Sequence, residues 1–137
     1  MNILTKTFLL SIACTSLASA GPLDGTWVNI DQNTRSIPKI VIASTAKEGT
    51  QLRWWGKTHP QDSEYGPVKL SLLGNSASDP SPDKHAYARE DDGFADKVFI
   101  ITTSGDQLVL ECLTLFKAND KLGRSNYREH QTFKRQQ

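Results

Sequence analysis

Residues 108–116 read Leu-Val-Leu-Glu-Cys-Leu-Thr-Leu-Phe. On a β-strand successive side chains point to opposite faces, so Leu108, Leu110, Cys112 and Phe116 share one face. Similar short runs recur along the chain with turn residues between them, and no segment of helical period and length follows residue 20. The segment therefore predicts one strand of an all-β protein.

Eight strands are expected in total. They cover residues 25–30, 38–43, 50–56, 65–73, 84–89, 96–103, 107–116 and 125–134. Gly, Pro, Asn and Asp between them supply turn chemistry. Consecutive strands with short turns favour an antiparallel up-and-down meander, and closing it into a barrel removes its exposed edges. An eight-stranded barrel is just wide enough to be filled by side chains or to hold one small ligand.

Alternation predicts which apolar residues point into this barrel. They are Ile40, Ile42, Leu52, Trp54, Val68, Leu70, Leu72, Leu108, Leu110 and Phe116. In the last strand Glu129 shares a face with Tyr127 and Phe133, and an inward carboxylate needs compensation. Glu129 therefore lies near a rim, pairs with an arginine or belongs to a polar ligand pocket. Trp55 faces away from Trp54, either under a loop or as part of an exposed recognition surface.

Residues 1–20 have the features of a cleaved secretory signal. Lys6 supplies a positive charge, residues 8–14 are apolar, and residues 18–20 read Ala-Ser-Ala. The apolar run is too short to cross a bilayer, and no later run approaches the required length. Two alternatives remain, a buried N-terminal helix and a lipoprotein signal that places a lipid on Cys14. The expected organisation is a signal over 1–20 and a single β-barrel domain over 21–137, in a secreted or periplasmic protein.

Charge and cysteine content limit the classes of partner and of stabilisation. The chain has 16 basic and 15 acidic residues, and loss of Lys6 with the signal makes the domain neutral. A neutral domain lacks the basic surface that nucleic acids require. Cleavage also removes Cys14, so Cys112 has no disulfide partner and the hydrophobic core must stabilise the fold. We interpret Cys112 as a small buried apolar residue and not as a nucleophile.

Residues 23–27, Leu-Asp-Gly-Thr-Trp, precede a meander with an arginine-rich last strand. This pattern resembles the calycin barrels, which comprise lipocalins, avidins and bacterial metalloprotease inhibitors. In lipocalins such a tryptophan closes one end of the barrel, and an arginine from the last strand packs across it. The resemblance therefore assigns the closing role to Trp27, with Arg124, Arg128 or Arg135 as the arginine.

A second resemblance extends over most of the chain after residue 20. Residues 25–29, 34–40, 55–66 and 123–127 are similar to a group of small exported proteins with a W-G-x-C-H-P-T-D-C-D-W-G segment. The group implies the fold but no particular activity. Its two cysteines correspond to Thr58 and Ser63 in this chain, so a disulfide across that loop is absent here.

His59, Asp62 and Glu64 lie in this same loop. They could be imagined as metal ligands, but zinc sites show tighter and more repetitive spacing. We favour a turn at His59, with Asp62 bonded to the local backbone, and expect no metal and no cofactor. Ser63 and Ser104 are the serines considered as nucleophiles. No nucleophile-elbow pattern surrounds either of them, so no enzyme activity is expected.

The leading hypothesis is an exported, non-catalytic binding protein for a small apolar or amphipathic ligand held in the barrel. The candidate ligand-binding residues are Trp27, Trp54, Tyr87, Tyr127 and Glu129. The alternative is a protein-interaction barrel that inhibits an exported hydrolase, through its N-terminal segment or through the loop with His59, Asp62 and Glu64. A secreted hydrolase ranks third, and neither nucleic acid nor a membrane span is expected.

The exported protein is expected to begin at Gly21, because the Ala-Ser-Ala triplet ends at Ala20. Intact-mass spectrometry of the secreted or periplasmic fraction measures this directly. A mass that still includes residues 1–20, or a diacylated Cys14, would contradict simple secretion.

Overall fold

The computed structural model describes residues 21–118 and 120–137, so the expected signal over residues 1–20 lies outside the described part. Those residues form nine strands and no helix. The strands are β1 (Gly25–Asn29), β2 (Lys39–Thr45), β3 (Gly49–Gly56), β4 (Ser63–Lys69), β5 (Ser71–Leu73), β6 (His85–Asp91), β7 (Ala95–Ser104), β8 (Gln107–Phe116) and β9 (Tyr127–Arg135). No described segment is a helix that could cross a membrane.

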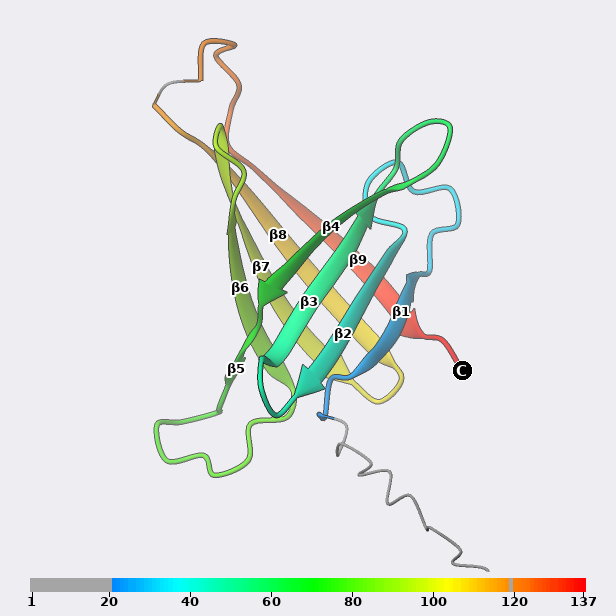
Figure 1. Cartoon of the computed structure of the whole chain (residues 1–137), viewed down its shortest axis with the longest axis vertical. Coiled ribbons are helices and arrows are strands. Elements are labelled where there is room, and N and C mark those ends of the chain that lie inside the picture. Colours follow the sequence, from blue (N-terminus) through cyan, green and yellow to red (C-terminus); the bar gives the residue numbers. More distant parts are fainter. Residues whose placement is uncertain (1–20, 119) are drawn as a thin grey trace, which may run out of the picture.

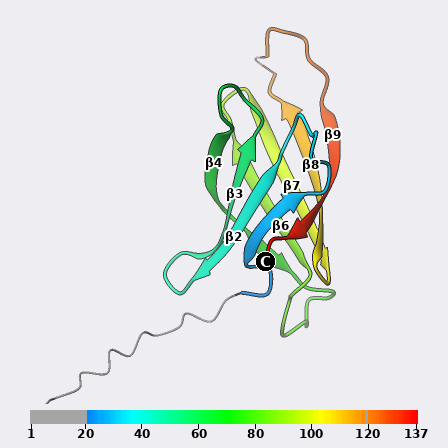
Figure 2. The same cartoon turned by 90° about the vertical axis from the view of Figure 1, so that its right-hand side faces the viewer.

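All strands belong to one antiparallel sheet with the order β4-β3-β2-β1-β9-β8-β7-β6-β5. Neighbours in the sheet are neighbours in the chain except at one place, where β1 pairs with β9 and joins the two ends of the domain. The sheet curls until its edge strands approach each other, and the result is a nearly closed barrel (Figures 1 and 2). The expected all-β antiparallel barrel is thus confirmed.

The strand count differs from the expected eight at a single point. The strand expected over residues 65–73 is divided at Leu70 into β4 and β5. β4 pairs with β3 whereas β5 pairs with β6, so the chain crosses between the two edges of the sheet at Leu70. The Leu70 side chain is buried (3% exposed) and fills the crossing point. We call the gap between β4 and β6 the seam; the two strands diverge away from β5 (Figure 1).

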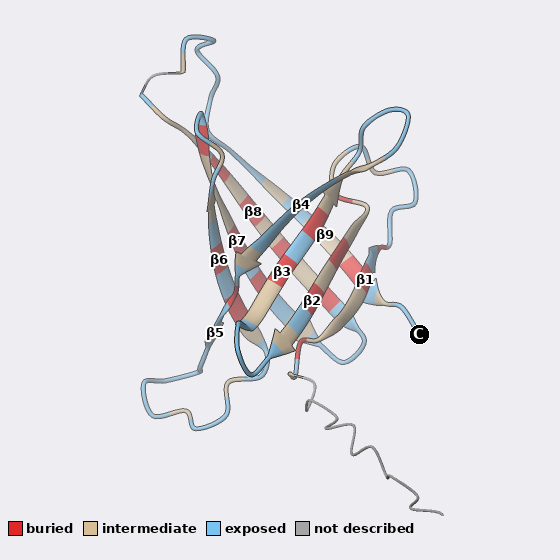
Figure 3. Ribbon diagram, in the orientation of Figure 1, coloured by how far each residue is buried: buried red, intermediate tan, exposed pale blue. Residues whose placement is uncertain are grey.

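Buried residues recur along the strands of the barrel (Figure 3), and most of them form one hydrophobic core. This core comprises Leu23, Trp27, Ile37, Ile40, Ile42, Leu52, Trp54, Leu70, Ala86, Ala88, Phe99, Ile101, Leu108, Leu110, Cys112 and Phe133. The inward residues expected from alternation belong to it or pack against it, with one exception. Phe116 lies half-buried at the end of β8, where its ring centroid is 6.2 Å from that of Tyr127.

One end of the barrel is closed by Trp27 and Arg135. Trp27 is fully buried, and its Nε1 donates a hydrogen bond to the Leu23 carbonyl oxygen at 3.1 Å. The Arg135 guanidinium lies 4.2 Å from the centroid of the Trp27 ring, and its Nη1 donates to the Asp24 carbonyl oxygen. A Cβ at Gly25 (φ +146°) would lie 2.8 Å from Arg135 Nη1, so this approach requires glycine.

The structure thereby decides among the three arginines. Arg135 holds the position across the tryptophan, whereas Arg124 pairs with Asp120 at 2.7 Å in the loop before β9. Arg128 lies 3.6 Å from Glu111 of β8, and both are on the outer face of the barrel. The arginine that closes the barrel is therefore the last residue of the last strand.

Substitution Arg135→Ala is expected to destabilise the fold by about 2–4 kcal/mol, because it removes both a cation–π contact and a charged hydrogen bond. Arg128→Ala is the matched control on the same strand, and loss of its exposed ion pair should cost less than about 1 kcal/mol. Urea unfolding followed by circular dichroism compares the two variants. Equal effects of the two would show that Arg135 does not hold the barrel end.

Candidate functional site

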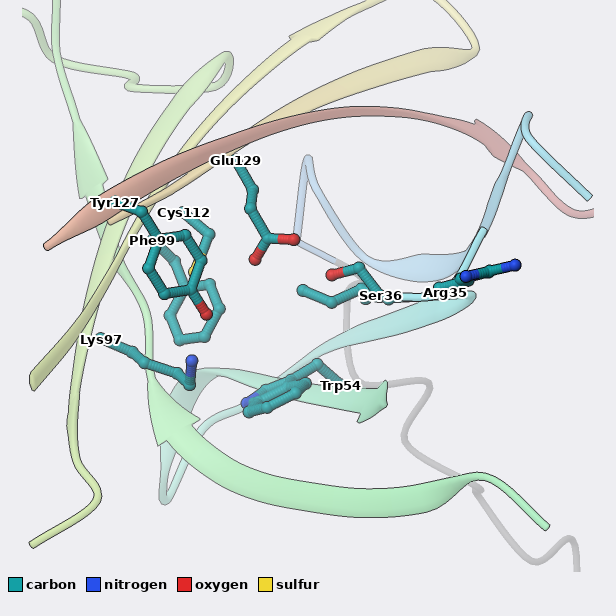
Figure 4. Close-up of a pocket in the computed structure, with 9 residues that line it drawn as sticks. Arg35, Ser36, Trp54, Lys97, Phe99, Cys112, Tyr127 and Glu129 are labelled. Atoms are coloured by element: carbon teal, nitrogen blue, oxygen red, sulfur yellow. The ribbon is translucent and has the colours of Figure 1, made fainter. Parts of the chain in front are cut away.

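A cavity of about 240 Å³ opens at the end of the barrel opposite Trp27. We call it the mouth cavity; Arg35, Ser36, Ile37, Trp54, Lys97, Phe99, Cys112, Tyr127 and Glu129 line it (Figure 4). Its position follows from β9, which begins with Tyr127 at the cavity and ends with Arg135 at the closed end. The interior is thus packed at one end and open at the other.

Period-two alternation brings lining residues to the inner face of four strands. Trp54 is near the end of β3, Lys97 and Phe99 are two apart on β7, Cys112 is on β8, and Tyr127 and Glu129 are two apart at the start of β9. The loop between β1 and β2 adds a further wall through residues 35–37. Residues far apart in the sequence therefore meet around one space.

Trp54 forms the aromatic floor of the cavity. Its ring stacks on Tyr65 with centroids 4.2 Å apart and lies tilted against Phe99 at 5.8 Å. Its Nε1 donates a hydrogen bond to Glu90 Oε2 at 3.2 Å. Trp55 faces the outside as expected, where the Lys39 ammonium lies 4.1 Å from its ring centroid. Three separate contacts thus fix the Trp54 indole, which can present a preorganised surface to a ligand.

Two opposite charges face the mouth cavity. The Lys97 ammonium donates to Thr114 Oγ1 at 3.2 Å and lies 5.9 Å from the Trp54 ring centroid. The Glu129 carboxylate points into the cavity, while the Arg35 guanidinium points away from it (Figure 4). Among the residues that the structure describes, no ion pair within 4.0 Å joins Lys97 to Glu129. Both charges are therefore available to a ligand.

A second hollow of about 410 Å³ adjoins the mouth cavity at the seam. This side hollow is lined by Tyr65, Asp92 and Phe94, and it shares Trp54 and Lys97 with the mouth cavity. The indole and the ammonium consequently form the partition between two adjacent spaces. A ligand in either space would contact both groups.

Burial changes the acidity of three groups around this partition. Desolvation raises the pKa of Glu90, with repulsion from Asp92 adding to it. Desolvation also raises the pKa of Asp92, while Lys97 lowers it. The Cys112 thiol is raised to a pKa of about 11, mainly by burial. Since thiolate is the reactive form, Cys112 remains an unreactive thiol at neutral pH.

The residues expected to bind a ligand are only partly brought together. Trp54, Tyr127 and Glu129 line the mouth cavity, whereas Trp27 lies in the packed end and lines neither space. Tyr87 was expected to line the lumen, but it lines neither space. It lies on the outer face of β6 between two buried alanines and is 38% exposed.

The sequence prediction missed Lys97, Phe99 and the loop residues 35–37. Alternation within β7 could have found Lys97, because it lies two residues from both Ala95 and Phe99, which are fully buried. Nothing comparable marks residues 35–37, which reach the cavity only because the β1–β2 loop folds over the barrel end.

His59, Asp62 and Glu64 do not converge. The His59 side chain is exposed, Asp62 lies 3.5 Å from Lys57, and Glu64 pairs with Arg53 at 3.0 Å. Among the residues that the structure describes, no group of three or more His, Cys, Asp or Glu side chains is arranged to hold a metal ion.

The hydroxyls of Thr58 and Ser63 face each other across the base of this loop, with their oxygens 2.8 Å apart. Thr58 Oγ1 also donates to the Gln61 carbonyl oxygen at 2.5 Å. The base of the loop is therefore closed by hydrogen bonds between these two positions.

Comparison with protein-family models, with curated proteins and with solved structures gives no match for this chain. The sheet order and the near closure are compatible with a calycin-like barrel.

Glu90→Gln is expected to raise the melting temperature at neutral pH, because it removes a partly buried charge and keeps an acceptor for Trp54. The pKa of Glu90 is raised in the folded state. Folding thus favours the protonated form, and the charge destabilises the fold at pH values above the folded pKa. The gain should vanish once the pH falls well below the unfolded-state pKa of about 4.3, because the carboxyl is then protonated in both states. Melting curves of both proteins between pH 3 and 8 would contradict this if their difference were independent of pH.

A disulfide between positions 58 and 63 should form without strain and stabilise the fold. In a background with Cys14 and Cys112 replaced by alanine, Thr58→Cys with Ser63→Cys is expected to oxidise. Closing a loop of about six residues contributes roughly 2 kcal/mol in the chain-entropy model. The melting temperatures of the oxidised and reduced forms measure the effect. Failure to oxidise, or a lower melting temperature on oxidation, would contradict the alignment of this loop with the cysteine-bearing group.

Proposed function

We propose that this chain is an exported, non-catalytic binding protein that holds one small amphipathic ligand in the mouth cavity. The observation that carries the proposal is the division of the barrel interior. One end is packed with apolar side chains, while the other leaves a space bounded by aromatic rings and two unpaired charges. Small-molecule sites combine mostly apolar walls with a few placed polar groups.

The size of the cavity limits the ligand. Its volume of about 240 Å³ is below the 300–1,000 Å³ common for drug-sized ligands. It equals the bulk volume of roughly eight water molecules. A compound with a single aromatic ring or a short alkyl chain and one polar group fits this space, whereas a long lipid chain would require displacement of the packed core.

Two features support the calycin-like part of the proposal. Arg135 of the last strand packs across Trp27 of the first, as in the lipocalin arrangement to which the sequence is similar. The facing hydroxyls of Thr58 and Ser63 support the similarity to the cysteine-bearing exported group.

The high pKa of Cys112 supports a non-catalytic role, because it removes the one cysteine of the described residues as a nucleophile.

Inhibition of an exported hydrolase remains the second candidate. It is favoured by the loop between β3 and β4, which is exposed and braced by the Thr58 hydrogen bonds and by the Lys57–Asp62 ion pair. A rigid exposed loop loses little entropy on binding a partner. Residues of this loop would then matter for activity, and residues of the mouth cavity would not.

A small amphipathic ligand in the mouth cavity should shift the indole Nε1–H resonance of Trp54 in nitrogen–proton correlation spectra. The chain has three tryptophans, and Trp27 at the packed end serves as an internal control whose resonance should stay unchanged. At a ligand concentration of 100 times Kd the fold should gain about 2.7 kcal/mol. A panel of single-ring amines, alcohols and acids that leaves both the Trp54 resonance and the melting temperature unchanged would count against the proposal and favour the inhibitor.

A further inference from the structure

We propose that the mouth cavity selects a small organic cation, an amine or quaternary ammonium compound with an apolar body, and that Glu129 binds the positive charge. This inference rests on the proposed function, because it presumes that a ligand occupies the cavity. It adds the charge of that ligand and the residue that recognises it.

Carboxylates outnumber cations around the two spaces. Lys97 is the cation at the partition. Glu129 brings a carboxylate to the mouth cavity and Asp92 brings one to the side hollow. The carboxylate of Glu90 accepts a hydrogen bond from Trp54. The Arg35 side chain lines the cavity but carries its charge away from it (Figure 4). Charges interact more strongly near the protein interior than in bulk water, so an anion would meet net repulsion here and a cation net attraction.

Glu129 faces the mouth cavity from β9. The register places the uncharged Cys112 opposite Glu129 on β8, so no cross-strand cation is available to it. Its chain neighbour Arg128 points to the outer face, where it approaches Glu111. No hydrogen bond or ion pair joins the Glu129 carboxylate to another of the described residues, although outer-face carboxylates such as Glu64 have partners. A carboxylate that faces a cavity without a partner is suited to a cationic ligand.

Three aromatic residues line the mouth cavity, Trp54, Phe99 and Tyr127. Aromatic faces attract cations within about 6 Å of the ring centroid, and such rings combined with carboxylates recognise ammonium groups. The Lys97 ammonium, 5.9 Å from the Trp54 centroid, already uses this attraction from the partition.

Lys97 limits the cation to a single charge. Its ammonium is held by Thr114 Oγ1 at 3.2 Å, so it stays beside the cavity. A monocation beside Glu129 gains an ion pair on one wall and leaves the apolar body over Trp54. A dication would bring a second positive charge towards Lys97, which opposes binding.

The test uses three compounds with the same ring and a similar chain: 2-phenylethylamine, 2-phenylethanol and 3-phenylpropionate. Isothermal titration calorimetry of the full chain at pH 7 is expected to give the order amine, alcohol, acid, with the amine about tenfold tighter than the alcohol. Glu129→Gln should remove this preference and leave alcohol binding within about twofold. Glu64→Gln, whose partner Arg53 lies on the outer face, is the matched control and should leave all three affinities unchanged.

Lys97→Met provides a second variant, in case Glu129→Gln does not fold. Removal of the competing charge is expected to tighten amine binding by several-fold and to weaken binding of the acid. Binding of the acid as tightly as the amine, or an amine affinity that Glu129→Gln leaves unchanged, would overturn this inference while the proposed function stands. Absence of binding by all three compounds would overturn both.

Discussion

The barrel depends on the pairing of the first strand with the last. At this pairing the Arg135 guanidinium packs across the Trp27 ring. β1 and β9 are separated by almost the whole domain in sequence, and their ladder converts a meander with two open edges into a nearly closed wall. The guanidinium satisfies the Asp24 carbonyl and shields the indole, and in the described part of the chain no buried side-chain nitrogen or oxygen atom lacks a hydrogen-bond partner. The absence of a side chain at Gly25 leaves the space that this contact needs.

Closure at this end determines where polar groups can lie inside the barrel. Burying an unpaired charge is costly, and the buried polar residues in the described part of the chain, Asn29 and Thr114, carry no charge. Lys97, Glu129, Glu90 and Asp92 all lie towards the opposite end, where water reaches them or a hydrogen bond compensates them. The cost of burying an unpaired charge thus accounts for both the packed half and the polar half of the interior.

The seam adds the second asymmetry of the molecule. Because β4 pairs with β3 and β5 with β6, no ladder joins β4 to β6, and side chains bridge the gap instead. The hydrogen bond from Trp54 of β3 to Glu90 of β6 is such a bridge, and the two hollows meet beside it. The residue best placed to sense a ligand is therefore also one that holds the two sides of the barrel together.

Alternation and turn chemistry in the sequence were enough to predict the antiparallel barrel, and nearly all of the residues predicted to point inward do so, because side-chain direction in a strand is a local property. They also identified Trp54, Tyr127 and Glu129 as candidates for one site. The sequence could not choose Arg135 over Arg124 and Arg128 as the arginine that packs across Trp27, and it could not divide the strand at Leu70. Nor could it exclude Tyr87 from the ligand-binding residues, because the face of Tyr87 depends on the register of β6. It also could not bring residues 35–37 over the barrel end or place Lys97 against Trp54. These features depend on which strands and loops lie side by side once the sheet has closed. The tertiary fold alone brings residues that are far apart in the sequence into contact.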